Sequence, residues 1–227
     1  MLLLHLISGQ LSIVFFLLFI ISLVMSIAIH EFSHAFVATK LGDNTAKSLG
    51  RLTLNPISHL DVFGTLALLF IGIGWGKPVP FNPYNLKNPK TGSALISAAG
   101  PASNLIMAFI MSIPYLIIIN TNPSSQQLRS LVDIYSFIYF IISLNAALAI
   151  FNLIPVHPLD GFKVLGGFLP KNWYYDWSRM ERYGMYILLI LIIPINGGSI
   201  IGRVVLPLSE KITNLLLPNL ALLIGAT

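Results

Sequence analysis

A predominantly apolar stretch covers residues 11–39, and it limits what this chain can fold into more than any other feature. A helix needs about 20 mostly apolar residues to cross the hydrocarbon core of a bilayer, and this stretch is long enough. The composition agrees, because charged residues make up only 9% of the chain, against about 25% in soluble domains. We therefore interpret the chain as an all-α integral membrane protein, a polytopic helix bundle, and exclude a water-soluble class.

Three further apolar runs are long enough to be considered for spans: residues 93–119, 134–154 and 183–201. A shorter run, residues 62–75, falls below crossing length. We expect it to enter the bilayer and return on the same side, as a re-entrant or extended element after the first span. The sequence contains no internal repeat or long linker, so the simplest division is one membrane domain over residues 1–227.

The basic residues indicate the orientation, because Lys and Arg are retained on the cytoplasmic side of a membrane. Most of them lie in two polar segments, before the run at 93–119 (Lys40, Lys47, Arg51, Lys77, Lys87 and Lys90) and after the run at 134–154 (Lys163, Lys171, Arg179 and Arg182). Only Arg129 lies between those two runs. This pattern predicts a multi-pass protein of the cell membrane with both basic segments on the cytoplasmic side.

The remaining composition excludes several kinds of site. The net charge of +5 comes from scattered residues that form no basic run, so we expect no nucleic acid partner. The chain contains no cysteine, which excludes disulfides and thiolate metal sites. A metal site in this chain must therefore use histidine and carboxylate ligands.

Such ligands occur inside the first apolar stretch, at His30, Glu31 and His34. On a helix, His30 and His34 project from one face, because they are four residues apart. In the pattern H-E-x-x-H, two imidazoles typically hold zinc and the glutamate acts as a general base. An ionisable group in hydrocarbon costs on the order of 2.5 to 3.5 kcal/mol by insertion scales, so a neutralising cation favours a metal site over a packed polar patch.

Catalytic zinc usually takes three protein ligands, so a third ligand is expected. Five other residues are weaker candidates. Asp133 is predicted on the other side of the membrane, and Asp43 and Asp176 are in loops expected to be solvated. His59 and Asp61 are a plausible pair. Asp61 is also placed to cap the following segment. Asp160 is the stronger candidate, because Pro155 and Pro158 break the preceding span and allow an irregular chain beside a cavity.

These residues resemble the site-2 proteases, a family of intramembrane zinc metalloproteases. The resemblance rests on HEFSH at residues 30–34, AAGPASNL at 98–105 and NLIPVHPLDG at 152–161. Residues 50–64 and 76–89 are also similar to segments of small family members. The segments follow the family order over most of the chain between His30 and Gly161, which makes their combination more specific than any single motif.

The resemblance implies that His30, His34 and Asp160 bind zinc, and that Glu31 activates the water. It also places Asn152 and Asn104 near the site, where either amide is expected to donate to the developing oxyanion or to tie helices together. Two residues depart from the family pattern, His157 and Phe162. His157 stays open as an extra or alternative ligand, since it lies three residues before Asp160.

The function implied by the resemblance is that of a zinc-dependent endopeptidase, which hydrolyses a peptide bond in or near a transmembrane segment of a membrane protein. It would be a small form without PDZ or regulatory domains, with the lipid bilayer and a transmembrane substrate as its partners. The alternatives are a transporter or channel whose intramembrane His, Glu and Asp form an ion path, and a scaffold with a structural metal. The presence of Glu31 disfavours the scaffold, because a structural site needs no base.

The segment GKPVPFN at residues 76–82 suggests how a substrate would be held. In an extended strand, Pro78 and Pro80 blunt one edge, while Val79 and Phe81 keep their N–H groups on the other. We expect a partly unwound substrate to pair with that edge by strand addition.

Overall fold

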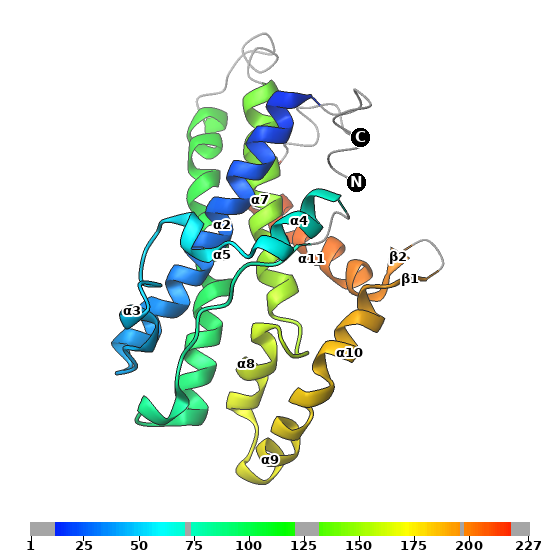
Figure 1. Cartoon of the computed structure of the whole chain (residues 1–227). Coiled ribbons are helices and arrows are strands. Elements are labelled where there is room, and N and C mark those ends of the chain that lie inside the picture. The colour runs from blue at the N-terminus through cyan, green and yellow to red at the C-terminus, as the bar shows by residue number, and fades with distance from the viewer. Residues whose placement is uncertain (1–11, 71–73, 121–131, 196–197, 219–227) are drawn as a thin grey trace. The chain divides into compact units, whose positions relative to one another are not determined.

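The computed structural model describes residues 12–70, 74–120, 132–195 and 198–218 (Figure 1). The chain forms two compact units, residues 1–100 and 101–227, and each is described by itself. Three helices among the described residues are long and apolar enough to cross a membrane, namely α2 (Ile13–Lys40), α5 (Pro89–Asn120) and α7 (Val132–Asn152). These correspond to the predicted spans at 11–39, 93–119 and 134–154, which confirms the all-α membrane class. The single domain over residues 1–227 stays a prediction.

The first unit is built around α2, whose outer apolar side chains, such as Ile21, Met25 and Phe36, are exposed as a lipid-facing helix requires. The helix ends at Lys40 with Leu41 as its C-cap, and Gly42 follows with a φ of 104°, a left-handed conformation that glycine adopts without steric cost. The short elements that follow are α3 (Thr45–Ser48), η1 (Pro56–His59), α4 (Val62–Phe70) and η2 (Pro83–Asn85). Both α3 and η1 pack against α2.

The segment around α4 returns to the place where it began. Leu60 and Gly76 form an antiparallel bridge, and the N–H of Lys77 donates to the carbonyl of His59 at 2.8 Å. With 9 residues, α4 is about 14 Å long, whereas the hydrocarbon core is about 30 Å thick. A helix of this length whose flanks pair with each other does not cross, which confirms the prediction of a short re-entrant element.

The second unit contains residues 101–120 of α5, followed by α7, α8 (Asp160–Phe168), α9 (Lys171–Arg179), α10 (Glu181–Ile192), β1 (Pro194–Ile195), β2 (Gly198–Ser199) and α11 (Ile200–Leu216). α11 packs along α7 through a buried face that repeats every four residues: Ile201, Val205, Ser209 and Thr213. The hydroxyl of Thr213 lies 3.2 Å from that of Ser143 on α7. Small and polar residues at this contact let the two helices approach closely.

The apolar run at residues 183–201 is not one helix, and here the structure corrects the sequence analysis. α10 ends at Ile192, and Pro194 begins a two-residue strand that pairs antiparallel with β2. Proline has no backbone N–H to continue the helix. The next helix begins after Ser199, whose hydroxyl accepts from the N–H of Gly202 at 3.0 Å.

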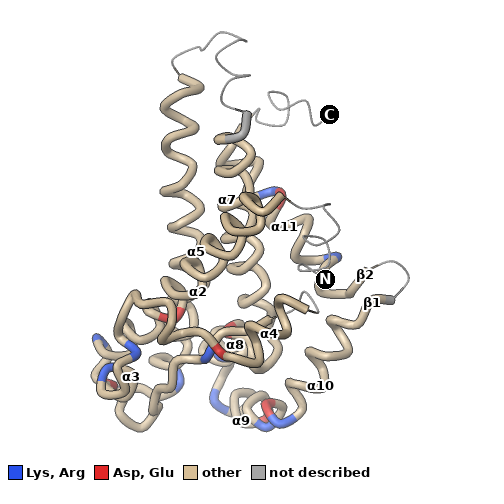
Figure 2. Tube along the Cα trace, turned by 45° about the horizontal axis from the view of Figure 1, so that its top comes forward, with Lys and Arg blue, Asp and Glu red and all other residues tan. Residues whose placement is uncertain are grey.

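Figure 2 shows where the charged residues lie within each unit. In the first unit, Lys and Arg gather at the end of α2 and around α3, and in the second unit they gather around α9. Arg129, which also contributed to the predicted orientation, lies outside the described residues. The apolar helices make the chain an integral membrane protein, and most of the described basic residues lie in the segments between and after them.

Candidate metal centre

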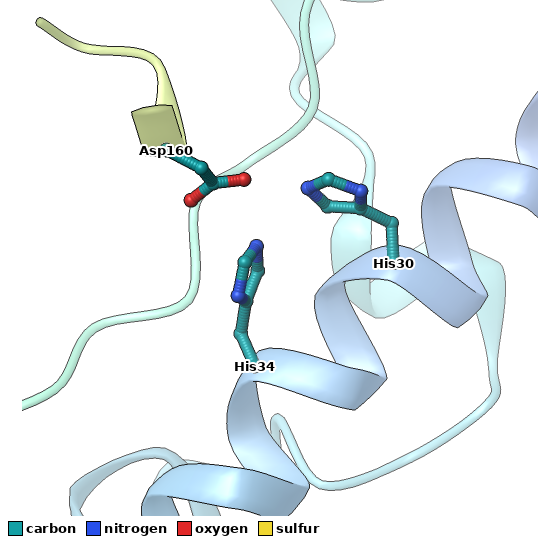
Figure 3. A group of neighbouring side chains, drawn as sticks. All are labelled: His30, His34 and Asp160. Carbon is teal, nitrogen blue, oxygen red and sulfur yellow. The ribbon is translucent and has the colours of Figure 1, made fainter. Parts of the chain in front are cut away.

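His30 and His34 lie on successive turns of α2 and project from the same face of the helix (Figure 3). Their ring centroids are 4.6 Å apart, and the ring planes are nearly perpendicular at 84°. Both side chains are buried. The arrangement confirms the geometry expected from their spacing, in which two imidazoles on one helix face the same space.

The ring of His34 is held in one tautomer by α5. Its Nδ1 lies 2.7 Å from the carbonyl oxygen of Ile96. Because a carbonyl oxygen only accepts, Nδ1 carries the proton and donates, which leaves the lone pair on Nε2. Metal-binding histidines are commonly oriented in this way, by a hydrogen bond from the ring nitrogen that does not bind the metal.

Gly100 on α5 leaves room for both imidazoles. A Cβ atom at this position would lie 2.5 Å from the Nε2 atoms of both His30 and His34. The two Nε2 atoms therefore converge beside a backbone that carries no side chain. Gly100 belongs to the segment AAGPASNL, whose resemblance to the family gave this residue no role, and a glycine within an apolar helix was the available signal.

Glu31, next to His30 on α2, is half-buried and is held by the loop that follows the re-entrant segment. The backbone N–H of Val79 donates to Oε2 of Glu31 at 2.9 Å. The strand edge that was expected to face a substrate thus directs the N–H of Val79 to Glu31 in this structure. The carboxylate is oriented by a fixed donor, as a base near a reaction centre requires.

Asp160 is the first residue of α8, in the second unit. The preceding helix ends at Asn152, and the intervening segment is irregular, as Pro155 and Pro158 predicted. Figure 3 draws Asp160 with the two histidines, and each of the three residues offers one ligand atom, an imidazole nitrogen or a carboxylate oxygen. Two histidines and one carboxylate form a donor set found in catalytic zinc sites, so the residues fit this metal.

The two predicted asparagines make bonds within the second unit. The amide nitrogen of Asn104 donates to Oδ1 of Asn145 at 3.0 Å, and Asn145 donates to the carbonyl of Ile141. This buried pair ties α5 to α7, one of the two roles predicted for Asn104. Asn152 is half-buried at the end of α7 and donates to the carbonyl of Leu148 at 2.9 Å. A role of either amide in catalysis stays a prediction.

His59 and Asp61, the alternative pair of ligands, make structural hydrogen bonds. His59 is fully buried, with Nε2 2.8 Å from the carbonyl oxygen of Thr53 and Nδ1 3.4 Å from Nη2 of Arg51. Oδ1 of Asp61 accepts from the N–H of Gly64 at 2.8 Å and caps α4. These bonds favour a structural role for both residues. Asp176 is exposed on α9, as expected, and the side chain of Asp133 lies outside the described part of the structure.

Asp43 was expected in a solvated loop, and this expectation is wrong. Its carboxylate is fully buried and accepts from the N–H of Asn82 and the amide of Asn85, both at 2.7 Å, and from the hydroxyl of Thr45 at 2.6 Å. Burial opposes ionisation, but these hydrogen bonds outweigh it and hold the pKa of Asp43 below its ordinary value. The residue joins the end of α2 to η2.

His157, the alternative ligand near Asp160, faces α10. Its Nε2 lies 3.2 Å from a carboxylate oxygen of Glu181, and burial lowers the pKa of the imidazole although Glu181 acts in the opposite direction. Phe162, the other departure from the family pattern, is buried and stacks on Trp177 of α9 with a centroid distance of 4.7 Å. Both departures thus have packing partners within the second unit.

Comparison with known proteins gives an independent result. Residues 113–195 match Peptidase family M50. YwhC from Bacillus subtilis, whose name proposes a zinc metalloprotease, is 39% identical over 183 residues, covering 80% of this chain and 83% of YwhC. Rip2 from Mycolicibacterium smegmatis, with a similarly worded name, is 30% identical over 183 residues, covering 78% of this chain and 67% of Rip2. The zinc metalloprotease MJ0392 from Methanocaldococcus jannaschii is 31% identical over 162 residues, covering 71% of this chain and 37% of MJ0392. No solved structure matches the chain.

The matched family segment includes the NLIPVHPLDG element, and the similarity to YwhC extends over most of both chains. These findings agree with the resemblance drawn from the motifs and favour an enzyme over a transporter or a scaffold. The chain belongs to peptidase family M50, the site-2 proteases, and is a zinc metalloprotease of that family.

Proposed function

We propose that this metalloprotease cleaves its substrates within the membrane, at a peptide bond in or near a transmembrane segment of another membrane protein. The observation that carries the proposal is the place of His30, Glu31 and His34 inside α2, a helix long and apolar enough to cross a bilayer. The candidate site is therefore in the part of the protein that lipid surrounds. A substrate that reaches it is itself a membrane protein.

We assign His30, His34 and Asp160 as the zinc ligands. The support is the converging Nε2 atoms beside Gly100, the fixed tautomer of His34, and the place of Asp160 after a broken helix, where the family element NLIPVHPLDG ends. These three residues would hold a zinc ion, which when bound would lower the pKa of a water molecule to about 7 and polarise the scissile carbonyl. Of the other candidate ligands, His59 has both ring nitrogens in other bonds, and Oδ1 of Asp61 caps α4.

Glu31 is the proposed general base. Because Val79 holds Oε2, we assign the proton transfer to Oε1. Glu31 takes a proton from the attacking water and passes it to the leaving amine nitrogen as the C–N bond breaks. A transmembrane helix must first unwind locally, because its peptide groups are occupied in internal hydrogen bonds.

Asn152 is the proposed donor to the oxyanion that develops on the scissile carbonyl. The support is its place at the end of α7, where it begins the family element NLIPVHPLDG that also contains Asp160. Removing a donor of this kind typically costs about 3 kcal/mol, or roughly a hundredfold in kcat. Asn104 is assigned the weaker role, because its fully buried amide ties α5 to α7 through Asn145, whereas the half-buried amide of Asn152 bonds only within its own helix.

We further propose that the site faces the cytoplasmic side of the cell membrane, since the basic residues lie at the end of α2 and around α9. The chain contains no cysteine, so single cysteines report topology without background. A cysteine at Lys47 should be shielded from an impermeant thiol reagent in intact cells, whereas one at Ser125 should react. The reverse pattern would contradict the orientation.

The decisive experiment uses the purified protein in lipid nanodiscs with a transmembrane substrate peptide. Glu31→Gln should lower cleavage by about 10²- to 10⁴-fold while about one zinc per chain remains bound. Asp160→Ala should lose both zinc and cleavage. Glu210→Gln, at an exposed position of α11, is the matched control and should retain both. Cleavage that survives Glu31→Gln would exclude Glu31 as the base.

A further inference from the structure

Arg51 occupies a buried position in the loop between α3 and η1, and it contacts the segment that leads to Val79. Its Nη2 donates to the carbonyl of Lys77, and its Nη1 donates to the carbonyl of Pro78 at 3.3 Å. The side chain is only 6% exposed. One guanidinium therefore holds the two carbonyls that immediately precede Val79.

The next backbone group along this segment reaches the proposed catalytic carboxylate, because the N–H of Val79 donates to Glu31 at 2.9 Å. Prolines on both sides restrict the backbone at Val79. The register of the segment thus decides where this N–H points, and the contacts of Arg51 hold that register where the bond from the N–H of Lys77 to His59 ends. A shift by one residue would replace it with a proline nitrogen, which has no hydrogen to donate.

We infer that Arg51 is a positioning residue for Glu31, acting through the backbone of residues 77–79. The inference rests on the proposed role of Glu31 as the general base. The guanidinium holds the segment against α2, and Val79 then fixes one carboxylate oxygen so that the other is directed to the proton it receives. His59 supports the arrangement, because its Nδ1 lies 3.4 Å from Nη2 of Arg51.

The chemistry of the side chain explains why arginine stands at position 51. A planar guanidinium offers several donors in a fixed fork and can hold two carbonyls at once, whereas the compact ammonium of lysine cannot reproduce that geometry. Nε of Arg51 is buried without a hydrogen-bond partner. An unsatisfied buried donor is destabilising, so packing alone does not account for this arginine.

The test compares two changes that break the same chain of contacts at different points. Arg51→Lys keeps the charge and loses the two-pronged contact. A backbone ester at Val79, introduced with the α-hydroxy analogue of valine, removes the N–H and leaves the side chains unchanged, while the Pro78 carbonyl becomes the weaker acceptor of an ester. The controls are Lys47→Ala, an exposed cation on α3, and an ester at Tyr84, whose exposed N–H donates to the side chain of Asn82 at 3.1 Å.

Both changes should lower kcat by about 10- to 100-fold, the effect of losing a hydrogen bond to a charged group, with KM changed less than about twofold. The double variant should be no slower than the slower single variant, because both break one path. Zinc content should stay unchanged in all of them. In ¹⁵N-valine-labelled protein, the Val79 amide signal should shift both in Arg51→Lys and in Glu31→Gln.

The inference is overturned if the Val79 ester binds zinc and keeps the kcat of the unmodified protein, or if the effects of the two changes multiply. If Arg51→Lys does not fold, the kcat of the Val79 ester and the shift of the Val79 amide signal in Glu31→Gln test the inference without it. The activity of Glu31→Gln distinguishes failure of the proposed function from failure of the positioning role of Arg51. Full activity in that variant removes the proposed function, whereas an inactive Glu31→Gln with fully active Arg51→Lys and ester proteins removes only this inference.

Discussion

Two clusters of polar side chains in the described part of the first unit differ in how their polar atoms are used. In the loop cluster, His59 and Asp61 make hydrogen bonds to backbone groups and to Arg51. In the α2 cluster, the Nε2 atoms of His30 and His34 converge beside Gly100. Both clusters carry residue types that bind zinc, and only the second brings ligand atoms together. Convergence of ligand atoms, more than residue type, distinguishes a candidate metal centre from a structural network.

The largest expected effect separates the histidines of the two clusters. His34→Ala should reduce bound zinc from about one per chain to near zero and abolish cleavage, because a ligand is lost. His59→Ala should keep the zinc and lower the free energy of unfolding by about 1 to 3 kcal/mol, because buried partners lose their hydrogen bonds. Metal analysis and thermal unfolding in nanodiscs measure the two effects. Loss of zinc in His59→Ala with the fold intact would remove the distinction between the clusters.

A smaller loss of zinc binding is expected when the Nε2 atoms of His30 and His34 are pushed apart by a change at a residue that is not a ligand. In Gly100→Ala, the new Cβ would lie 2.5 Å from both Nε2 atoms, so the rings must swing away. We expect zinc affinity to fall by about 10- to 100-fold, as for residues that orient metal ligands. The fold should be retained, since alanine favours a helix over glycine.

Gly198→Ala is the matched control for this change, because a Cβ there meets nothing within 4 Å. Zinc affinity measured by competition with a chelator should be the same in Gly198→Ala and in the wild-type protein. Equal affinity in the Gly100 variant as well would show that the rings do not depend on the gap that this glycine leaves.

The sequence predicted the fold well where hydrophobic runs are long and uninterrupted. α2, α5 and α7 follow runs that reach crossing length, and the re-entrant segment follows a run that does not. The prediction failed at residues 183–201, where the apolar composition continues through Pro194 although the helix does not. Hydropathy measures the solvent that a segment prefers, whereas the end of a helix depends on single residues such as proline.

The sequence predicted the part of the candidate site that depends on the spacing of neighbouring residues, and it did not predict contacts between distant residues. Two histidines four residues apart on a helix must face the same way, and the structure confirms this for His30 and His34. The roles of Gly100, Arg51 and Asp43 were missed, because each depends on contacts with residues far away in the sequence. Asp43 shows the difficulty most clearly, since a charged residue in a polar loop resembles a solvated one until its partners are known.

Asp43 and its partners form a third group of polar atoms in the first unit. The contribution of Asp43 to the free energy of unfolding should depend on pH. Its pKa is lowered in the folded protein, because the hydrogen bonds from Thr45, Asn85 and Asn82 outweigh burial. The stability it contributes is therefore present above the unfolded pKa of about 3.9 and is lost as pH falls through the folded pKa. At pH 7, Asp43→Asn should lower the free energy of unfolding by about 1 to 3 kcal/mol, because one acceptor becomes a donor facing donors.

The difference between wild type and Asp43→Asn should shrink as pH falls below the unfolded pKa of about 3.9, because the carboxylate then takes up a proton in the unfolded chain while it stays ionised in the folded protein. Unfolding measured as a function of pH tests this. Asp176→Asn, at an exposed position of α9, is the matched control for the loss of one carboxylate. A difference that stays constant from pH 7 to the acid range would mean that the charge of Asp43 is not what its partners stabilise.

The smallest expected effect concerns Asp61, the loop residue with the simplest structural task. Its carboxylate caps α4 by accepting from Gly64, so Asp61→Ala should lower the free energy of unfolding by about 1 kcal/mol, and Asp61→Ser should restore most of it because serine also caps helices. Zinc content should be the same in both variants. If the metal were lost in Asp61→Ala and not restored by serine, Asp61 would belong with the ligands. A cap needs only an oxygen that accepts one backbone hydrogen bond, whereas a zinc ligand needs a carboxylate, and the serine variant separates these two requirements.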